Sequence, residues 1–164
     1  VASLAFSGGF YDAFRSAPAA REHHHAYPGG LLDHTVEVVE LCLKASCLYP
    51  ELDLDLLLAG ALLHDIGKVD EYALSPSGVV RTPAGELLGH VFIGASRVAS
   101  LCAEAGVIGD PAMKLVHLIL SHHGKREWGS PVEPAIPEAV VLHQADLLSA
   151  RAAAAVKGAV RRGA

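Results

Sequence analysis

The sequence predicts an all-α domain, and three observations lead to this prediction. Hydrophobic residues make up 51% of the 164 residues, which is enough for one sizeable core. Aromatic residues make up only 5%, while leucine, alanine and valine are abundant, and this balance favours helix packing over a β-sandwich. Apolar residues also recur at helical spacings in successive segments. We therefore expect one domain over residues 1–164, a helical bundle with one short β-hairpin or loop near residues 71–83.

Turn and capping residues divide the chain into the expected elements. Pro50, Gly106, Gly109 and Gly124 separate apolar segments, and Asp110-Pro111 pairs a capping residue with proline at the first helical position. The turn Ser75-Pro76-Ser77-Gly78 lies between two short apolar runs and predicts the hairpin. The expected helices are an opening helix within residues 1–20, one over Leu31–Tyr49, one from Asp53 or Asp55 to about Ile66, one that Gly89-His90 opens, one from Asp110 to Gly124 and one from Glu138 to the C-terminus.

The charge and the cysteine content exclude some classes of protein for this chain. The formal net charge is −5, so the overall balance does not indicate nucleic-acid binding. The three cysteines lack the spacing of a zinc knuckle, and we expect reduced, buried thiols in a cytoplasmic protein. No secretory signal pattern opens the chain, and no apolar run is long enough to span a bilayer. The first residue is Val1 rather than methionine, so we expect a piece of a longer protein.

The stretch 62–68, Leu-Leu-His-Asp-Ile-Gly-Lys, is the most informative part of the sequence. It places an imidazole beside a carboxylate directly after the apolar run Leu54–Leu63. Because charged groups are rarely buried without a partner, a helix that delivers both groups to the core edge suggests metal ligation. The alternative is an ordinary helix end, at which Asp65 is solvated, Gly67 stops the helix and Lys68 favours its negative end. The dipeptide alone leaves both interpretations open.

The arrangement of histidines and acids favours the metal interpretation. The candidates lie at ends or edges of separate expected helices, from which side chains can meet inside a bundle. Imidazoles and carboxylates suit Mn, Fe, Co, Ni or Zn, and the lack of cysteine in the set argues against a structural zinc site. The set exceeds the needs of one ion, so we expect two divalent ions about 3.5–4 Å apart that share a carboxylate. The candidate ligands are His34, His64, Asp65, His90, His122, His123 and Asp146.

Five stretches contain most of the histidines and acids discussed above or lie next to them, and their order along the chain can be compared with the order of motifs in known families. They are residues 25–34, 62–68, 87–90, 118–124 and 129–131. This succession resembles the HD-domain metal-dependent phosphohydrolase superfamily, and it looks closest to the HD domain of YhaM-type 3'-to-5' exoribonucleases. The resemblance spans most of the chain. It implies an HD-type helical bundle and favours Mn as the metal.

The resemblance also implies roles for the candidate residues. It implies that Asp65 bridges two ions, and that Lys68 neutralises a phosphate oxygen. Two features of the exoribonucleases are missing from this sequence: the N-terminal OB-fold that grips single-stranded RNA, and a second acid where this chain has Ser149. The implied ligands are His34, His64, Asp65 and Asp146 for one ion, and Asp65, His90, His122 and His123 for the other.

We expect a metal-dependent phosphodiesterase that uses a metal-bridging hydroxide, with Asp65 and Lys68 as the catalytic residues. The resemblance makes a 3'-to-5' exoribonuclease acting on single-stranded RNA the first hypothesis. Basic side chains would orient the phosphate, and a terminal base would stack on an aromatic ring. The candidate substrate-binding residues are Lys68, His24, Arg126, Tyr27 and Trp128, with Tyr72 as a further stacking candidate.

Two other functions stay open. The same centre could act on nucleotides, cyclic nucleotides or cyclic dinucleotides, although the loop after His122-His123 lacks the Gly-Tyr-Pro signature of cyclic-dinucleotide hydrolases. A non-catalytic signalling or scaffold domain is the third hypothesis, and the complete ligand set with Lys68 argues against it. A homo-oligomer is also left open.

Overall fold

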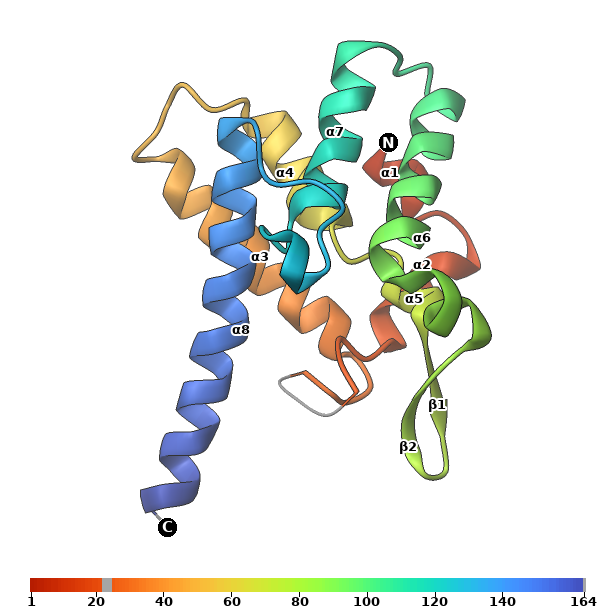
Figure 1. Cartoon of the computed structure of the whole chain (residues 1–164), viewed down its shortest axis with the longest axis vertical. Coiled ribbons are helices and arrows are strands. Elements are labelled where there is room, and N and C mark those ends of the chain that lie inside the picture. The colour runs from red at the N-terminus through yellow and green to blue at the C-terminus, as the bar shows by residue number, and fades with distance from the viewer. Residues whose placement is uncertain (22–24, 164) are drawn as a thin grey trace.

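The computed structural model describes the backbone of residues 1–21 and 25–163, and the side chains of the same ranges up to residue 156. The fold is all-α with one antiparallel hairpin, as predicted (Figure 1). In chain order the elements are α1 (Ala2–Ala5), α2 (Gly9–Ser16), α3 (Gly30–Ser46), α4 (Leu54–Leu63), α5 (Lys68–Glu71), β1 (Tyr72–Ser75), β2 (Gly78–Arg81), α6 (Pro83–Glu104), α7 (Asp110–Ser121), the 3-10 helix η1 (Arg126–Trp128) and α8 (Pro137–Gly163).

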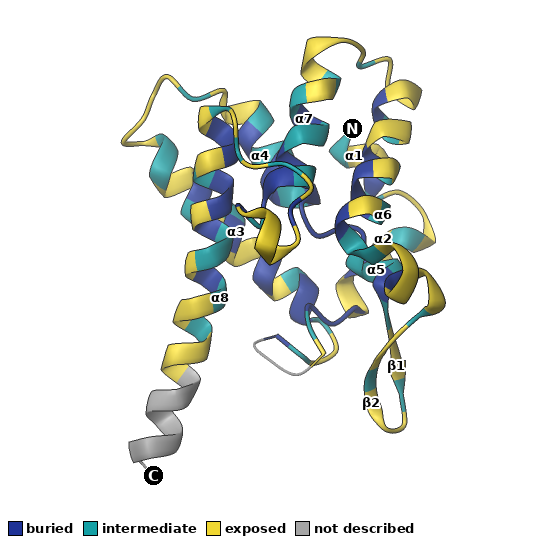
Figure 2. Cartoon of the chain, viewed as in Figure 1, coloured by how far each residue is buried: buried dark blue, intermediate teal, exposed yellow. Residues whose placement is uncertain are grey.

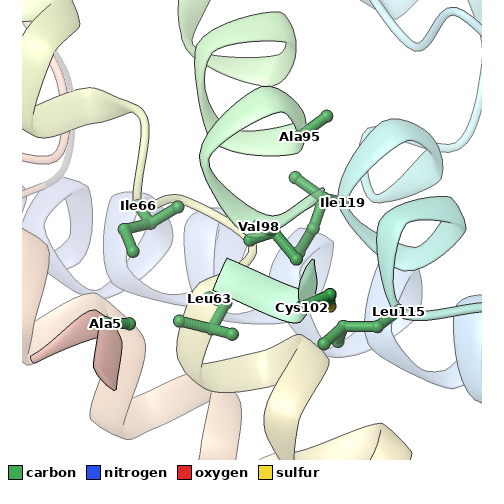
Figure 3. Packing of buried hydrophobic residues seen from close by; sticks show 8 residues of the cluster. All are labelled: Ala5, Leu63, Ile66, Ala95, Val98, Cys102, Leu115 and Ile119. Atoms are coloured by element: carbon green, nitrogen blue, oxygen red, sulfur yellow. The ribbon is translucent and has the colours of Figure 1, made fainter. Parts of the chain in front are cut away.

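Helix α4 lies at the centre of the bundle and contacts α3, α7 and α8. Its sequence is apolar on nearly every side, and such a helix is stable only when other elements cover it. One core cluster gathers side chains from α6 and α7 around Leu63 at the end of α4 (Figure 3). A second cluster joins α4 to α3 and α8. The buried faces therefore meet along α4, while the outer faces of α3, α6 and α8 are exposed (Figure 2).

The central helix ends earlier than the sequence predicts. We expected it to continue to about Ile66, but α4 ends at Leu63, and residues 64–67 form a turn before α5. This turn packs closely at Gly67, where a Cβ atom would collide with the carbonyl oxygen of His90 and lie 2.7 Å from the nitrogen of Gly94. The backbone of this turn thus lies directly against α6, which fixes the position of His64 and Asp65.

Replacing Gly67 with alanine is expected to lower the free energy of unfolding by about 2–3 kcal/mol, because the added methyl group meets backbone atoms that cannot rotate away. Gly9→Ala is the matched control. A Cβ atom there meets no atom within 4 Å, so the change should stay below about 1 kcal/mol. Urea denaturation followed by circular dichroism measures both values. Equal stabilities of the two variants would contradict the packing argument.

Several other helix boundaries differ from the prediction. The opening segment forms two short helices instead of one, because the chain turns at Gly8, whose φ is 59°. Helix α6 begins at Pro83, capped by Thr82, so Gly89 is a kink within the helix rather than its start. At the start of α7 the capping position is held by Gly109, and the predicted cap Asp110 instead pairs with Lys114 at 2.7 Å. The turns of the hairpin and the start of α8 agree with the prediction.

Two shorter differences concern helix ends. Helix α3 ends at Ser46 rather than Tyr49, and α7 ends at Ser121 rather than Gly124. His122 caps α7 and His123 follows it, so the pair lies in the turn after the helix.

The cysteines are free, and Cys42 and Cys102 are buried as expected while Cys47 is exposed. Burial raises the pKa of the Cys42 thiol to about 12. Among the described helices, none combines the length and hydropathy that crossing a bilayer requires.

Candidate metal centre

Asp65 lies between two sets of imidazoles, one facing each of its carboxylate oxygens. Its Oδ2 is 3.3 Å from Nε2 of His64 and 3.5 Å from Nε2 of His34. Its Oδ1 is 3.6 Å from Nε2 of both His90 and His122. The side chain is only 2% exposed. A buried carboxylate that presents each oxygen to a separate ligand set has the arrangement of a bridging ligand between two ions.

The first set brings together side chains from α3, the turn after α4, and α8. The ligand atoms of His34, His64 and Asp146 all lie within 4.8 Å of one another. Nε2 of His34 is 3.1 Å from Oδ1 of Asp146 and 3.3 Å from Nε2 of His64. These residues are widely separated in the sequence, and the packing of α3 and α8 against α4 brings them together.

The second set comes from the kink in α6 and the turn after α7. The ligand atoms of His90, His122 and His123 also lie within 4.8 Å of one another, and Nε2 of His90 is 3.2 Å from Nε2 of His123. Gly89, with φ 70° and ψ 154°, lets the helix bend immediately before His90. All seven predicted ligand residues therefore lie around one centre.

Each of the five imidazoles in the two sets has an acceptor near Nδ1, which leaves Nε2 directed toward the centre. This is the usual arrangement of metal-binding histidines, because the outer acceptor fixes the tautomer and the ring orientation. Two of the acceptors are side chains and three are backbone carbonyls. The distances from Nδ1 are 2.8 Å to the Ala61 oxygen for His64, 2.7 Å to the Ile119 oxygen for His122, 2.9 Å to the Trp128 oxygen for His123, 2.8 Å to Glu71 Oε2 for His90 and 3.0 Å to Ser149 Oγ for His34.

The charge states of the second set and of the two carboxylates suit a cation. At His64 the charge of Asp65 outweighs burial and raises the pKa above its ordinary value, so a cation bound there would displace a proton. Burial lowers the pKa values of His90, His122 and His123, that of His123 to about 4, so these rings are neutral near pH 7. Burial alone would raise the pKa values of Asp65 and Asp146. The charge of Lys68 on Asp65, and the contact of Asp146 with Nε2 of His34 at 3.1 Å, outweigh burial, so both pKa values lie below their ordinary range. Neutral imidazoles and ionised carboxylates are the forms that bind metals.

The polar atoms left without partners test whether a metal fits. Among the described side chains, Asp65 Oδ1 and His122 Nε2 are buried and have no hydrogen-bond partner. They face each other at 3.6 Å, which is too long for a hydrogen bond. A buried polar atom without a partner is costly, and a cation bound by both atoms would satisfy them. The histidine clusters can therefore bind a divalent metal.

Lys68 begins α5 and directs its ammonium group into the centre. Its Nζ is 2.6 Å from Oδ2 of Asp65, and the side chain is 14% exposed. Burial alone would lower the pKa of Lys68, but the charge of Asp65 raises it above its ordinary value. The group therefore stays positively charged at the edge of the centre.

Of the residues predicted to bind the substrate, only some lie beside the metal centre in the part of the chain that the structure describes. Trp128 lies beside the second set, because its carbonyl oxygen accepts from His123, and the residue is 43% exposed. Tyr27 lies farther out, where its hydroxyl group donates to Asp33 at 2.8 Å. Arg126 is exposed on η1, and within the described residues no hydrogen bond or ion pair joins it to the centre. His24 lies outside the described residues.

Four further residues surround the centre and were not predicted to have a role there. Glu71 lies behind His90, and Glu37 accepts at 2.6 Å from Ser149, the residue noted above only as a departure from the family. His143 lies at 2.8 Å from the His122 carbonyl oxygen and packs against Gly124, so it supports the turn that carries His122 and His123. The sequence gives one signal for His143, its position about one turn before Asp146. Nothing in the sequence singled out Glu71 or Glu37.

His25 forms a third group with residues already described. Ligand atoms of His25, His34 and Glu37 lie within 4.8 Å of one another, and the rings of His25 and His34 are 5.6 Å apart. His25 is buried and adopts a φ of 59°, which is unusual for a residue with a side chain. Of the run His23-His24-His25, this residue therefore lies next to the first set.

Comparison with known proteins agrees with this geometry. A family model described as the HD domain matches residues 31–151, and a model described as a putative helicase matches residues 10–51. No solved structure matches the chain.

Curated relatives cover most of the chain. The chain is 43% identical over 141 residues to a protein of Listeria monocytogenes serotype 4b (strain CLIP80459), and 44% identical over 138 residues to one of Bacillus licheniformis. Both relatives are named 3'-5' exoribonuclease YhaM. The matches cover 86% and 84% of this chain but only 45% and 44% of the relatives, so the chain spans less than half of their length. Because the HD match covers most of the chain and includes all seven ligand candidates, the chain belongs to the HD domain family.

Proposed function

We propose that this chain is the catalytic domain of a metal-dependent phosphodiesterase that removes nucleotides from the 3' end of single-stranded RNA. The observation that carries the proposal is the position of Asp65, with one oxygen toward each set of histidines. The exoribonuclease name of the relatives supports RNA as the substrate. Residues 1–164 would act as one domain.

The roles proposed for the residues follow from their positions. His34, His64 and Asp146 would hold one ion, His90, His122 and His123 would hold a second, and Asp65 would bind both. When bound, the two ions would lower the pKa of water and neutralise charge on the phosphate oxygens. Mn is the favoured metal on the family resemblance. Asp65 thus sets the spacing of the two sites, and no protein nucleophile is required.

Lys68 would bind a phosphate oxygen of the substrate. Its ammonium group lies at the centre and stays protonated, so it can form a charge-assisted hydrogen bond with an anionic oxygen. The exposed ring of Trp128, whose carbonyl oxygen orients His123, is the best-placed candidate for stacking on the terminal base. Roles for Tyr27, Arg126 and His24 in substrate binding stay predictions, as do an N-terminal OB-fold domain, a homo-oligomer and a cytoplasmic location.

A comparison of substrates tests the proposal. Short single-stranded RNA labelled at its 5' end, mononucleotides and cyclic dinucleotides would each be incubated with the protein and Mn²⁺. We expect RNA products that shorten stepwise from the 3' end, and no cleavage after addition of a chelator. Turnover of nucleotides or cyclic dinucleotides with intact RNA would contradict the proposed substrate. Two bound ions without turnover of any substrate would indicate a scaffold domain.

A further inference from the structure

Glu71 is a buried acid whose carboxylate lies directly behind a metal-ligand candidate. It is the last residue of α5, and its side chain is 2% exposed. Its Oε2 lies 2.8 Å from Nδ1 of His90, on the opposite side of the ring from the nitrogen that faces Asp65. Burying a carboxylate is costly unless it has partners, so this position needs an explanation.

The hairpin and the start of α6 hold Glu71 in place. Nη2 of Arg81, the last residue of β2, is 3.5 Å from Oε1 of Glu71. The backbone nitrogen of Thr82 donates to the Glu71 carbonyl oxygen at 2.9 Å, and Gly85 packs so closely that a Cβ atom there would lie 2.9 Å from Cγ of Glu71. The carboxylate is therefore fixed by elements that contain none of the ligand candidates except His90.

Within the second set, His90 is the residue whose ring most needs an external support. The kink at Gly89 separates it from the first part of α6, so a continuous helix does not orient it. His122 and His123 are oriented by hydrogen bonds to backbone carbonyl oxygens, whereas the group behind His90 is a charged side chain at ion-pair distance, 2.8 Å from Nδ1. An ionised carboxylate at Nδ1 keeps the proton there and the lone pair on Nε2.

We propose that Glu71 is a positioning residue for the second ion, and that Arg81 links the β1–β2 hairpin to that ion through Glu71. Glu71 does not touch the ion. It orients the His90 ring and makes Nε2 a stronger donor. This inference rests on the two-ion function proposed above.

Metal titration of Glu71→Gln tests the inference, with Asp70→Asn as the matched control. Asp70 is the neighbouring acid, and its carboxylate is partly exposed and pairs with Arg97 at 2.6 Å. Isothermal titration with Mn²⁺, and the visible spectrum with Co²⁺, would report each ion. We expect two ions in the unchanged chain and in Asp70→Asn. In Glu71→Gln the affinity for one ion should fall about 10- to 100-fold, while the other is unchanged. Turnover should then recover at high Mn²⁺ concentration, which a folding defect would not allow.

Other outcomes would overturn the inference. If Glu71→Gln binds two ions with unchanged affinity, or loses both equally, Glu71 is not a positioning residue for the second ion. Arg81→Gln provides a second variant that should fold, because this side chain is 44% exposed. It should weaken the same ion severalfold, and an unchanged affinity would overturn the link to the hairpin. If the wild-type chain binds fewer than two ions, the proposed function itself fails. Failure of the proposed function can therefore be distinguished from failure of the inference about Glu71.

Discussion

The Asp65→Asn variant is expected to lose both metal ions and at least about a thousandfold of turnover. Each oxygen of Asp65 faces a different set of histidines, so one substitution weakens both sites. The amide is nearly the same size as the carboxylate but carries no charge, and its nitrogen cannot act as a metal ligand. Metal content after dialysis, measured by elemental analysis, and turnover of labelled RNA would report the two losses.

The control for this variant is Asp12→Asn, which makes the same chemical change at an exposed site where Asp12 pairs with Arg15 on its own helix. It should keep both ions and full turnover. Retention of two ions and more than a tenth of the turnover in Asp65→Asn would contradict the bridging role.

Removal of the divalent metal is expected to lower Tm by about 10–20 °C. Each ion at a hundredfold excess over its Kd adds about 2.7 kcal/mol to the free energy of unfolding, so two ions together add about 5 kcal/mol. For a domain of this size, 1 kcal/mol shifts Tm by about 2–4 °C. Thermal unfolding followed by circular dichroism, with Mn²⁺ and then with a chelator, measures the shift. The metal-free protein should also be inactive and should recover when Mn²⁺ is added.

Calcium is the control for this experiment. It prefers ligand sets made of oxygen atoms, whereas five of the seven ligand candidates here are imidazoles. Added Ca²⁺ should therefore restore little of the Tm, and the Asp65→Asn variant should respond weakly to either metal. A chelator that leaves the Tm of the unchanged chain within 2 °C of its starting value would rule out tightly bound ions.

The helices and the candidate ligands could be predicted because their signals are local. The apolar stripe of α3 and the polar residues that interrupt apolar runs are visible in short windows of sequence. His64 and Asp65 stand out because they follow a segment that must be buried. The resemblance to a family then grouped residues that no local pattern could connect, such as His34 and Asp146.

The supporting residues could not be predicted because their roles depend on tertiary packing. Glu71 lies between the half-buried residues Asp70 and Tyr72 in the sequence, and the approach of the hairpin and α6 buries it. The turn after α4 is a further example, since the close contact between Gly67 and the backbone of α6 is a tertiary feature that no local pattern shows. The kink at Gly89 was read as a helix start because a glycine before a histidine gives no information about the residues packed around it.

The position of the first ligand set has a consequence for how the chain unfolds. His34 lies on α3 and Asp146 on α8, so a single ion bound by both would close a loop that contains most of the polypeptide. Such an ion would link the two helices only in the folded state, and by mass action it would favour the state in which both helices are docked. Metal release and loss of protection against proteolysis of α8 would then occur together, so susceptibility of this helix to a protease would follow the occupancy of the ion.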